Sequence, residues 1–147
     1  MTTKVLDWKF ASFTVYMASR LQWDAVDYDP YSTFEEMQAD YQKTGRIKVT
    51  TLHSANSIYG YEWINVCGRA WHDYCHLTMN AGFNQDGERK AAQLQIRQVR
   101  EHFGWTLESD KFCRIIDAEV NGQVSYYLQY GDFPVNGYEF TKGYLNA

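Results

Sequence analysis

The segment SIYGYEWINVCGRAWHDYCHLTM spans residues 57–79 and is the first of three long stretches whose patterns favour helices. The sequence predicts these helices at residues 57–79, 86–103 and 110–130. Gly82 and Asn84 occupy the first gap between them and residues 104–109 the second, and such residues end one helix and cap the next. A short helix is expected after Pro134. We therefore expect any functional site to lie between packed helices.

The N-terminal third combines helical and strand-like patterns. Four apolar residues at helical spacing favour a first helix, although the residues around them would also suit a strand: Phe10, Phe13, Met17 and Leu21. Thr33 and Glu36 have the spacing of a capping box, and the helix that they begin should end near Gly45. Residues 46–52 alternate and are rich in Ile, Val and Thr. The expected fold is a mostly α, compact helical domain with a small strand or hairpin in the N-terminal third.

Composition limits the classes of protein that the chain can represent. Its 147 residues, without repeats or linkers, predict a single domain over residues 1–147. The net charge of −4 and the scattered basic residues argue against nucleic-acid binding. No apolar run is long enough to span a bilayer and no signal peptide is evident, so a cytoplasmic location is expected. The aromatic content of 17% is high enough that a homodimer, covering some of the rings, is also expected.

The motif His72-Asp73-Tyr74-Cys75-His76 carries the clearest chemistry. Residues four apart lie on one face of a helix, so the two imidazoles can converge on one metal ion. Glu88 lies in the first turn of the next predicted helix, on its inward-facing stripe. A buried carboxylate is unfavourable without a charged partner, and an ion held by the histidines would be that partner. A solvated Glu88 that interacts with the helix dipole is the alternative.

Two further carboxylates are candidates for catalysis. Glu119 and Gln123 interrupt the apolar stripe of the predicted helix 110–130, so Glu119 is a candidate ligand, general base or orienting carboxylate. Asp73 is a candidate ligand or general base, or a surface residue paired with Arg69 one turn earlier.

Cysteine chemistry is a weaker hypothesis. Three cysteines without a CxxC pair argue against a disulfide scaffold. Cys75 is more simply explained as a small packing residue than as a metal ligand. A nucleophilic pair of Cys75 with His53 stays open, without positive support from the sequence.

The spacing of the metal motif resembles that of a known family. His72-Asp73-x-x-His76, eleven intervening residues and then Glu88 are similar to the HDxxH-x11-E motif of the coenzyme Q biosynthesis family. Helical members of that family bind zinc or another divalent ion, so the resemblance implies that His72, His76 and Glu88 are metal ligands.

A longer part of the chain resembles small proteins encoded by tailed bacteriophages. The resemblance begins at Ser57 and ends at Pro134. Between them it includes Arg69 to Asp73, the dipeptide Gly87-Glu88 and the segment 118–123. It implies a virus-encoded protein that acts in an infected bacterial cytoplasm. Arg69, Glu119 and Gln123 match recurring positions of these proteins.

Two functions are therefore expected as alternatives. The first is a metal-dependent hydrolase or lyase in which Glu119 or Asp73 is the base and the substrate is a small molecule. Zinc is the favoured ion, and Mn, Fe and Ni are also compatible with two histidines and a carboxylate. The second is a non-catalytic acidic protein that binds and modulates a host protein, with a structural ion or none.

Overall fold

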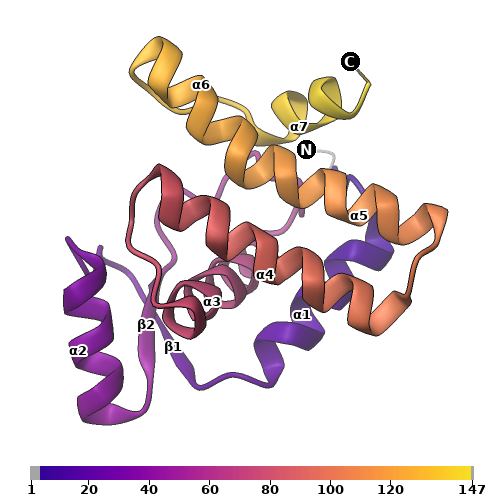
Figure 1. Cartoon of the computed structure of the whole chain (residues 1–147). Helices are drawn as coiled ribbons and strands as arrows, with labels where there is room; N and C mark the ends of the chain where they lie inside the picture. Colours follow the sequence, from indigo (N-terminus) through magenta and orange to yellow (C-terminus); the bar gives the residue numbers. More distant parts are fainter. Residues whose placement is uncertain (1–3, 147) are drawn as a thin grey trace.

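The computed structural model describes residues 4–146 and has the helical architecture that the sequence predicts (Figure 1). Its elements follow in the order α1 Trp8–Ser19, β1 Trp23–Val26, α2 Phe34–Thr44, β2 Ile47–Thr50, α3 Glu62–Met79, α4 Gln85–Phe103, α5 Leu107–Asp117, the π-helical turn η1 Ala118–Gly122, α6 Gln123–Tyr130 and α7 Gly137–Leu145. No helix of the described residues has the length and apolarity needed to cross a membrane.

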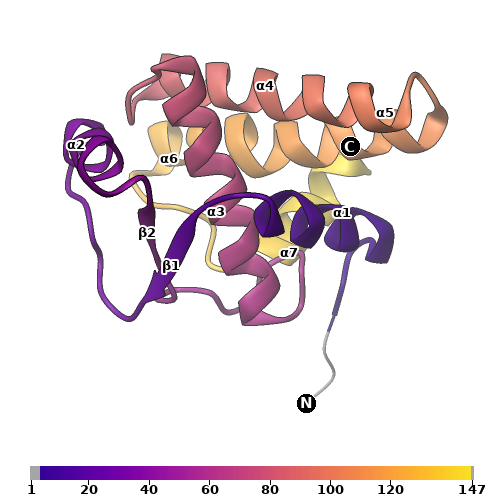
Figure 2. The same cartoon turned by 90° about the horizontal axis from the view of Figure 1, so that it is seen from below.

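Helix α3 is the centre of the fold. It packs against α1 and α4, and Figure 2 shows it running steeply across the direction of α4, α5 and α6. Helices α4 and α5 run antiparallel, and α6 continues the line of α5 through η1 (Figure 1). A helix in this position can present side chains to several neighbours at once, which is why the site lies along α3.

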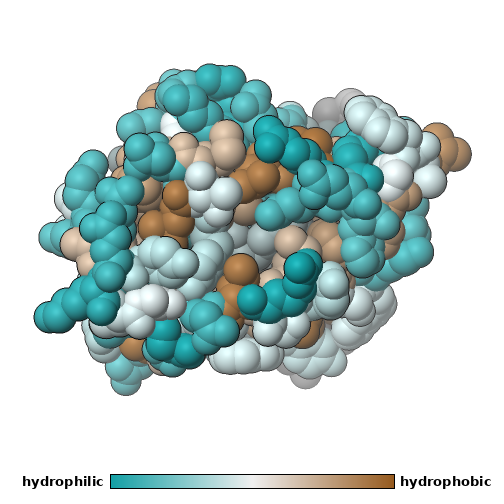
Figure 3. Space-filling view, turned by 60° about the horizontal axis from the view of Figure 1, so that its bottom comes forward, coloured by the Kyte–Doolittle hydropathy of each residue, from teal (hydrophilic) through white to brown (hydrophobic). Residues whose placement is uncertain are grey.

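Hydrophobic side chains bury two faces of α3. One cluster joins Trp71 and Cys75 of α3 to α1, α4 and α5, with Phe10 and Phe112 among its rings. The other joins a second face of α3 to α2 and the strands, through residues such as Val66 and Met37. On the face shown in Figure 3, hydrophobic residues form small separate patches among hydrophilic ones.

The two strands are parallel, so the alternative of a hairpin is wrong. Trp23 pairs with Ile47 and Val26 with Thr50, and α2 forms the connection between the strands. Parallel strands need such a crossover because the end of the first strand and the start of the second lie at opposite edges of the sheet. The strand predicted at residues 46–52 is confirmed as β2, whereas no sequence pattern indicated β1.

Capping explains where the N-terminal helices begin and end. The helical alternative for the first segment is confirmed, and the Asp7 side chain accepts the amide hydrogen bond of Phe10 at the start of α1. Thr33 caps α2 as predicted, and α2 ends at Gly45 with a φ of 73°. The left-handed conformation at this position favours glycine.

The long helices differ from prediction in two places. Helix α3 begins at Glu62 rather than near residue 57, because Gly60 adopts a φ of 74° that interrupts the helical path. The predicted helix 110–130 begins earlier, at Leu107 after the Thr106 cap, and contains the π-helical turn η1. The helix at 86–103 and the short helix after Pro134 are confirmed.

Candidate metal centre and cavity

The turn between α3 and α4 brings the histidines and Glu88 together. Helix α3 ends at Met79 with Asn80 as its C-cap in the left-handed region, and the Asn84 side chain caps α4. Gly87 packs so closely on this turn that an added Cβ would lie 1.8 Å from the carbonyl oxygen of Gly82. This close approach places Glu88, the next residue, against the histidine face of α3.

Three donor atoms converge at this point. The Nε2 atom of His72 lies 2.7 Å from Oε2 of Glu88, and Nε2 of His76 lies 3.1 Å from the same oxygen. The two Nε2 atoms are 3.1 Å apart. His72, His76 and Glu88 form a group that can hold a metal ion. The sequence spacing predicted this convergence.

The other ring nitrogens are held by hydrogen-bond acceptors. Nδ1 of His76 lies 2.8 Å from the carbonyl oxygen of Ala81, and Nδ1 of His72 lies 2.8 Å from Oε1 of Gln95. Each Nδ1 therefore carries a proton, so the neutral ring has its lone pair on Nε2. Metal-binding histidines are commonly oriented in this way by a carbonyl or carboxylate acceptor.

The donor set fits a divalent cation. With two lone pairs and a carboxylate oxygen facing one another, the group is repulsive unless a proton or a cation lies between the atoms. Metal–nitrogen bonds of about 2.0–2.1 Å in tetrahedral geometry separate two nitrogen ligands by about 3.3 Å, close to the spacing of the two imidazoles. The ligand atoms therefore need little rearrangement to bind an ion.

Burial and charge have opposite effects on the pKa values in this group. Burial disfavours the charged form of Glu88, but hydrogen bonds and charge from His72 and His76 outweigh it and lower the pKa to about 2. Burial likewise opposes protonation of His72, yet its contacts with Glu88 raise the pKa of the imidazole. The carboxylate is thus ionised across the physiological range, as a metal ligand must be.

The group borders a cavity of about 840 Å³. His72 and Glu88 line it, with side chains 21% and 24% exposed, whereas His76 is buried behind them at 1%. The segments 53–57 and 133–137 form another part of the wall, and the Tyr138 amide just after them donates to the Asn56 carbonyl. An ion at the group would therefore be reachable from the cavity on one side.

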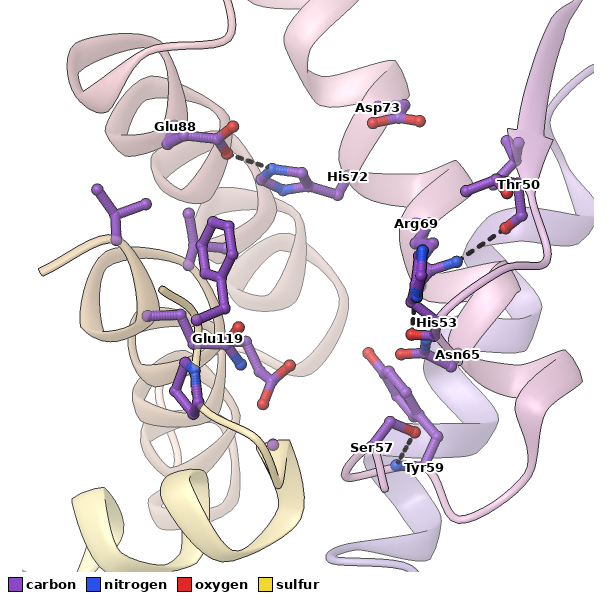
Figure 4. Close-up of a pocket in the computed structure, with 18 of the residues that line it drawn as sticks. Thr50, His53, Ser57, Tyr59, Asn65, Arg69, His72, Asp73, Glu88 and Glu119 are labelled. Carbon is purple, nitrogen blue, oxygen red and sulfur yellow. Dashed lines mark hydrogen bonds and ion pairs between the residues drawn. The ribbon is translucent and has the colours of Figure 1, made fainter. Parts of the chain in front are cut away.

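Asp73 lines the same cavity beside His72 (Figure 4). No hydrogen bond or ion pair within residues 4–146 involves its carboxylate, and burial raises its pKa to about 6. It is not part of the three-residue ligand group. The predicted alternative of a surface pair with Arg69 is wrong, because Asp73 faces the cavity and Arg69 bonds elsewhere.

Arg69 of α3 forms hydrogen bonds with the loop at residues 50–53. Its Nη1 donates to the carbonyl oxygens of Thr50, at 2.9 Å, and Leu52, and its Nη2 donates to that of His53 at 2.7 Å. Figure 4 shows the guanidinium directed at this loop. These bonds could not be predicted from the sequence, because acceptance by a backbone carbonyl does not depend on residue type.

Glu119 lies on another wall of the cavity, in the π-helical turn η1. π-helical turns are rare and are frequent at functional sites. The Thr141 hydroxyl of α7 donates to Oε1 of Glu119, and burial raises the pKa of this carboxyl to about 7 despite hydrogen bonds from Thr141 and Gln123. Glu119 does not join the ligand group of His72, His76 and Glu88.

The cysteine hypotheses find no support in the geometry. Cys75 is buried, and its thiol contacts Oε1 of Gln98 at 3.5 Å. Burial raises the pKa of this thiol to about 12, so a reactive thiolate is disfavoured. His53 lines the cavity, whereas Cys75 does not. Cys75 is therefore a packing residue, as the simpler prediction had it.

Comparisons of the whole chain with protein-family models, curated proteins and solved structures gave no match. The candidate metal centre and its cavity are therefore the features of the chain that bear on its function.

Proposed function

We propose that the protein is a metal-dependent hydrolase or lyase whose ion is bound by His72, His76 and Glu88. The observation that supports this most strongly is the convergence of three oriented donor atoms at the wall of a large cavity. A structural zinc site has four protein ligands, whereas a catalytic site has three and a position open to water or substrate.

Zinc is the ion that we favour. Two histidines and one glutamate form the ligand set of a common class of catalytic zinc sites. Mn, Fe and Ni accept the same ligands. A bound divalent ion would supply Lewis acidity, which polarises a substrate oxygen or lowers the pKa of water.

Asp73 is the general base in this proposal. Its carboxylate lines the cavity next to His72 and has no hydrogen-bond partner in residues 4–146, so it is free to accept a proton. In hydrolysis it would take a proton from water as the water oxygen attacks the substrate, and return it to the leaving group. On the basis of the resemblance to phage proteins, we also propose that the protein acts in the cytoplasm of an infected bacterium.

Metal binding is tested by elemental analysis of the purified protein and by zinc titration after chelation. We expect one equivalent of ion per chain, and loss of this binding in His72→Ala and His76→Ala. His53→Ala is the matched control, because it removes a cavity-lining histidine outside the ligand group and should retain one equivalent. Absence of stoichiometric binding of Zn, Mn, Fe and Ni would refute the proposal.

Catalysis is tested with chromogenic esters and amides as substrates. Asp73→Asn should retain one equivalent of zinc and lose about 10²- to 10⁴-fold in kcat, the usual contribution of a general base. Full activity in Asp73→Asn would exclude its role as base. A structural ion would be indicated instead if the protein binds one equivalent of metal, His72→Ala is unfolded and no substrate is turned over.

A further inference from the structure

The cationic side chains that line the cavity already have partners within the protein. Arg69 and Lys48 are the cationic side chains that line it, and both are engaged. Arg69 donates to three backbone carbonyls, and Nζ of Lys48 lies 3.1 Å from a carboxylate oxygen of Asp40. Within the described residues the cavity therefore offers no free cationic side chain to an anionic group.

Glu119 is placed differently. From the π-helical turn η1, the Glu119 carboxylate points across the cavity toward the hydroxyl group of Tyr59 (Figure 4). Its partners, Thr141 and Gln123, are neutral, and no ion pair within residues 4–146 involves it. A carboxylate that is largely withdrawn from water, with neutral partners only, is electrostatically unsatisfied. A cationic ligand would satisfy it.

The space beside Glu119 suits a ligand with a flat apolar body. Apolar and aromatic side chains from four parts of the chain line the cavity together with Glu119: Phe10, Tyr59, Ile116, Val120 and Phe133. A volume of about 840 Å³ lies within the roughly 300–1,000 Å³ of typical small-molecule sites. The cavity therefore has room for one ligand that extends from Glu119 to the metal centre.

We propose that Glu119 binds a cationic nitrogen group of the substrate, an ammonium, amidinium or guanidinium, while the reacting end of the same substrate lies at His72 and Glu88. This inference rests on the proposed function only for the reacting end. The preference of Glu119 for a cation does not depend on the metal, and Glu119 is thereby a specificity residue rather than the base.

The test uses three ligands of nearly the same shape and different charge: benzamidine, benzamide and benzoate. Binding is measured by calorimetry and by amide chemical shifts at pH 8, above the pKa of about 7 of Glu119. We expect benzamidine to bind at least tenfold more tightly than benzamide, and benzoate to bind most weakly. The shifts should centre on residues 119–124 and on Tyr59. Equal affinity for benzoate and benzamidine, or shifts confined to other surfaces, would overturn the inference.

A charge-neutral variant separates recognition from general electrostatics. Glu119→Gln should weaken the binding of benzamidine at least tenfold and change the affinity for benzamide less than twofold. Glu101→Gln, which removes the same charge from an exposed position on α4, should change neither. Unchanged benzamidine affinity in Glu119→Gln refutes the inference. If this variant does not fold, the ligand order and shift map of the unmodified protein decide the question.

Metal dependence keeps the two proposals distinguishable. Each titration is performed on chelated protein and on protein with one equivalent of zinc. Benzamidine should bind more tightly than benzamide in both, whereas benzoate, which can coordinate zinc through its carboxylate, is compared with the other two only on the chelated protein. If none of Zn, Mn, Fe and Ni binds, the proposed function falls, while selective benzamidine binding still establishes the cation site at Glu119.

Discussion

The Nε2 atoms of His72 and His76 lie 3.1 Å apart, and each ring is fixed through its Nδ1 atom by an acceptor on a different segment. Gln95 of α4 holds the first ring and the Ala81 carbonyl holds the second. The orientation of the two imidazoles thus depends on residues outside the proposed ligand group, and this dependence can be tested.

Gln95→Leu should weaken zinc binding about 10- to 100-fold, the usual cost of losing the partner that orients a histidine ligand. The substitution keeps the size of the side chain but removes the acceptor of the His72 Nδ1 proton. Competition with a chromogenic chelator measures the affinity. Gln93→Leu, at an exposed position on α4, is the control, and unchanged affinity in Gln95→Leu would contradict the orienting role.

Gly87→Ala should destabilise the protein by about 3 kcal/mol or more, because backbone clashes are not relieved by rotamer changes. The new Cβ would meet the Gly82 carbonyl oxygen at 1.8 Å. Gly143→Ala on α7 is the matched change, since nothing lies within 4 Å of its added Cβ. It should be neutral or stabilising by up to about 1 kcal/mol. Chemical denaturation compares the two, and similar stabilities would show that the turn can relax.

Glu119 should make folding less favourable as the pH rises from 4.5 to 7. The folded state raises the pKa of Glu119 from 4.5 to about 7, so it retains a proton that the unfolded state releases. The stabilising contribution is complete below pH 4.5 and is lost as the pH passes 7, at a cost of about 3 kcal/mol at most.

Glu119→Gln removes this titration and should be the more stable protein at pH 8. The difference in unfolding free energy between the variant and the parent, measured from pH 4 to 8, isolates Glu119 from other groups that titrate in this range. Glu101→Gln should give a flat difference curve. A flat curve for Glu119→Gln would show that its carboxyl is solvated.

Arg69→Lys should loosen the loop at residues 50–53. An ammonium group lacks the planar fork with which Arg69 reaches three carbonyl oxygens, and each unsatisfied carbonyl costs about 1–3 kcal/mol. Hydrogen exchange of the amides in this loop should accelerate at least tenfold. The exposed Arg97→Lys is the control, and equal exchange rates in the two variants would exclude Arg69 as the anchor.

The convergence of the proposed metal ligands could be predicted because it depends on local geometry. Helical spacing places His72 and His76 on one face, and a short turn that contains Gly82 returns the chain so that Glu88 meets them. The orienting role of Gln95 could not be predicted, because it depends on how α4 rotates against α3.

Glu119 shows the limit of periodicity. Its place on an apolar stripe predicted an inward-facing carboxylate, and the structure has it lining the cavity. The π-helical turn that directs it there has no sequence signature, so its separation from the metal ligands was not foreseeable. Likewise, the left-handed Gly60 shortened α3 because turn conformation overrode helical spacing.

The hydrogen bond from the Tyr138 amide to the Asn56 carbonyl has a consequence for biosynthesis. The ribosome makes the three donor residues well before the segment 133–138 that completes the cavity wall. If the three residues bind an ion as proposed and fold before that segment, the ion would reach them from open solvent. The C-terminal segment would then complete the cavity wall around an ion that is already bound.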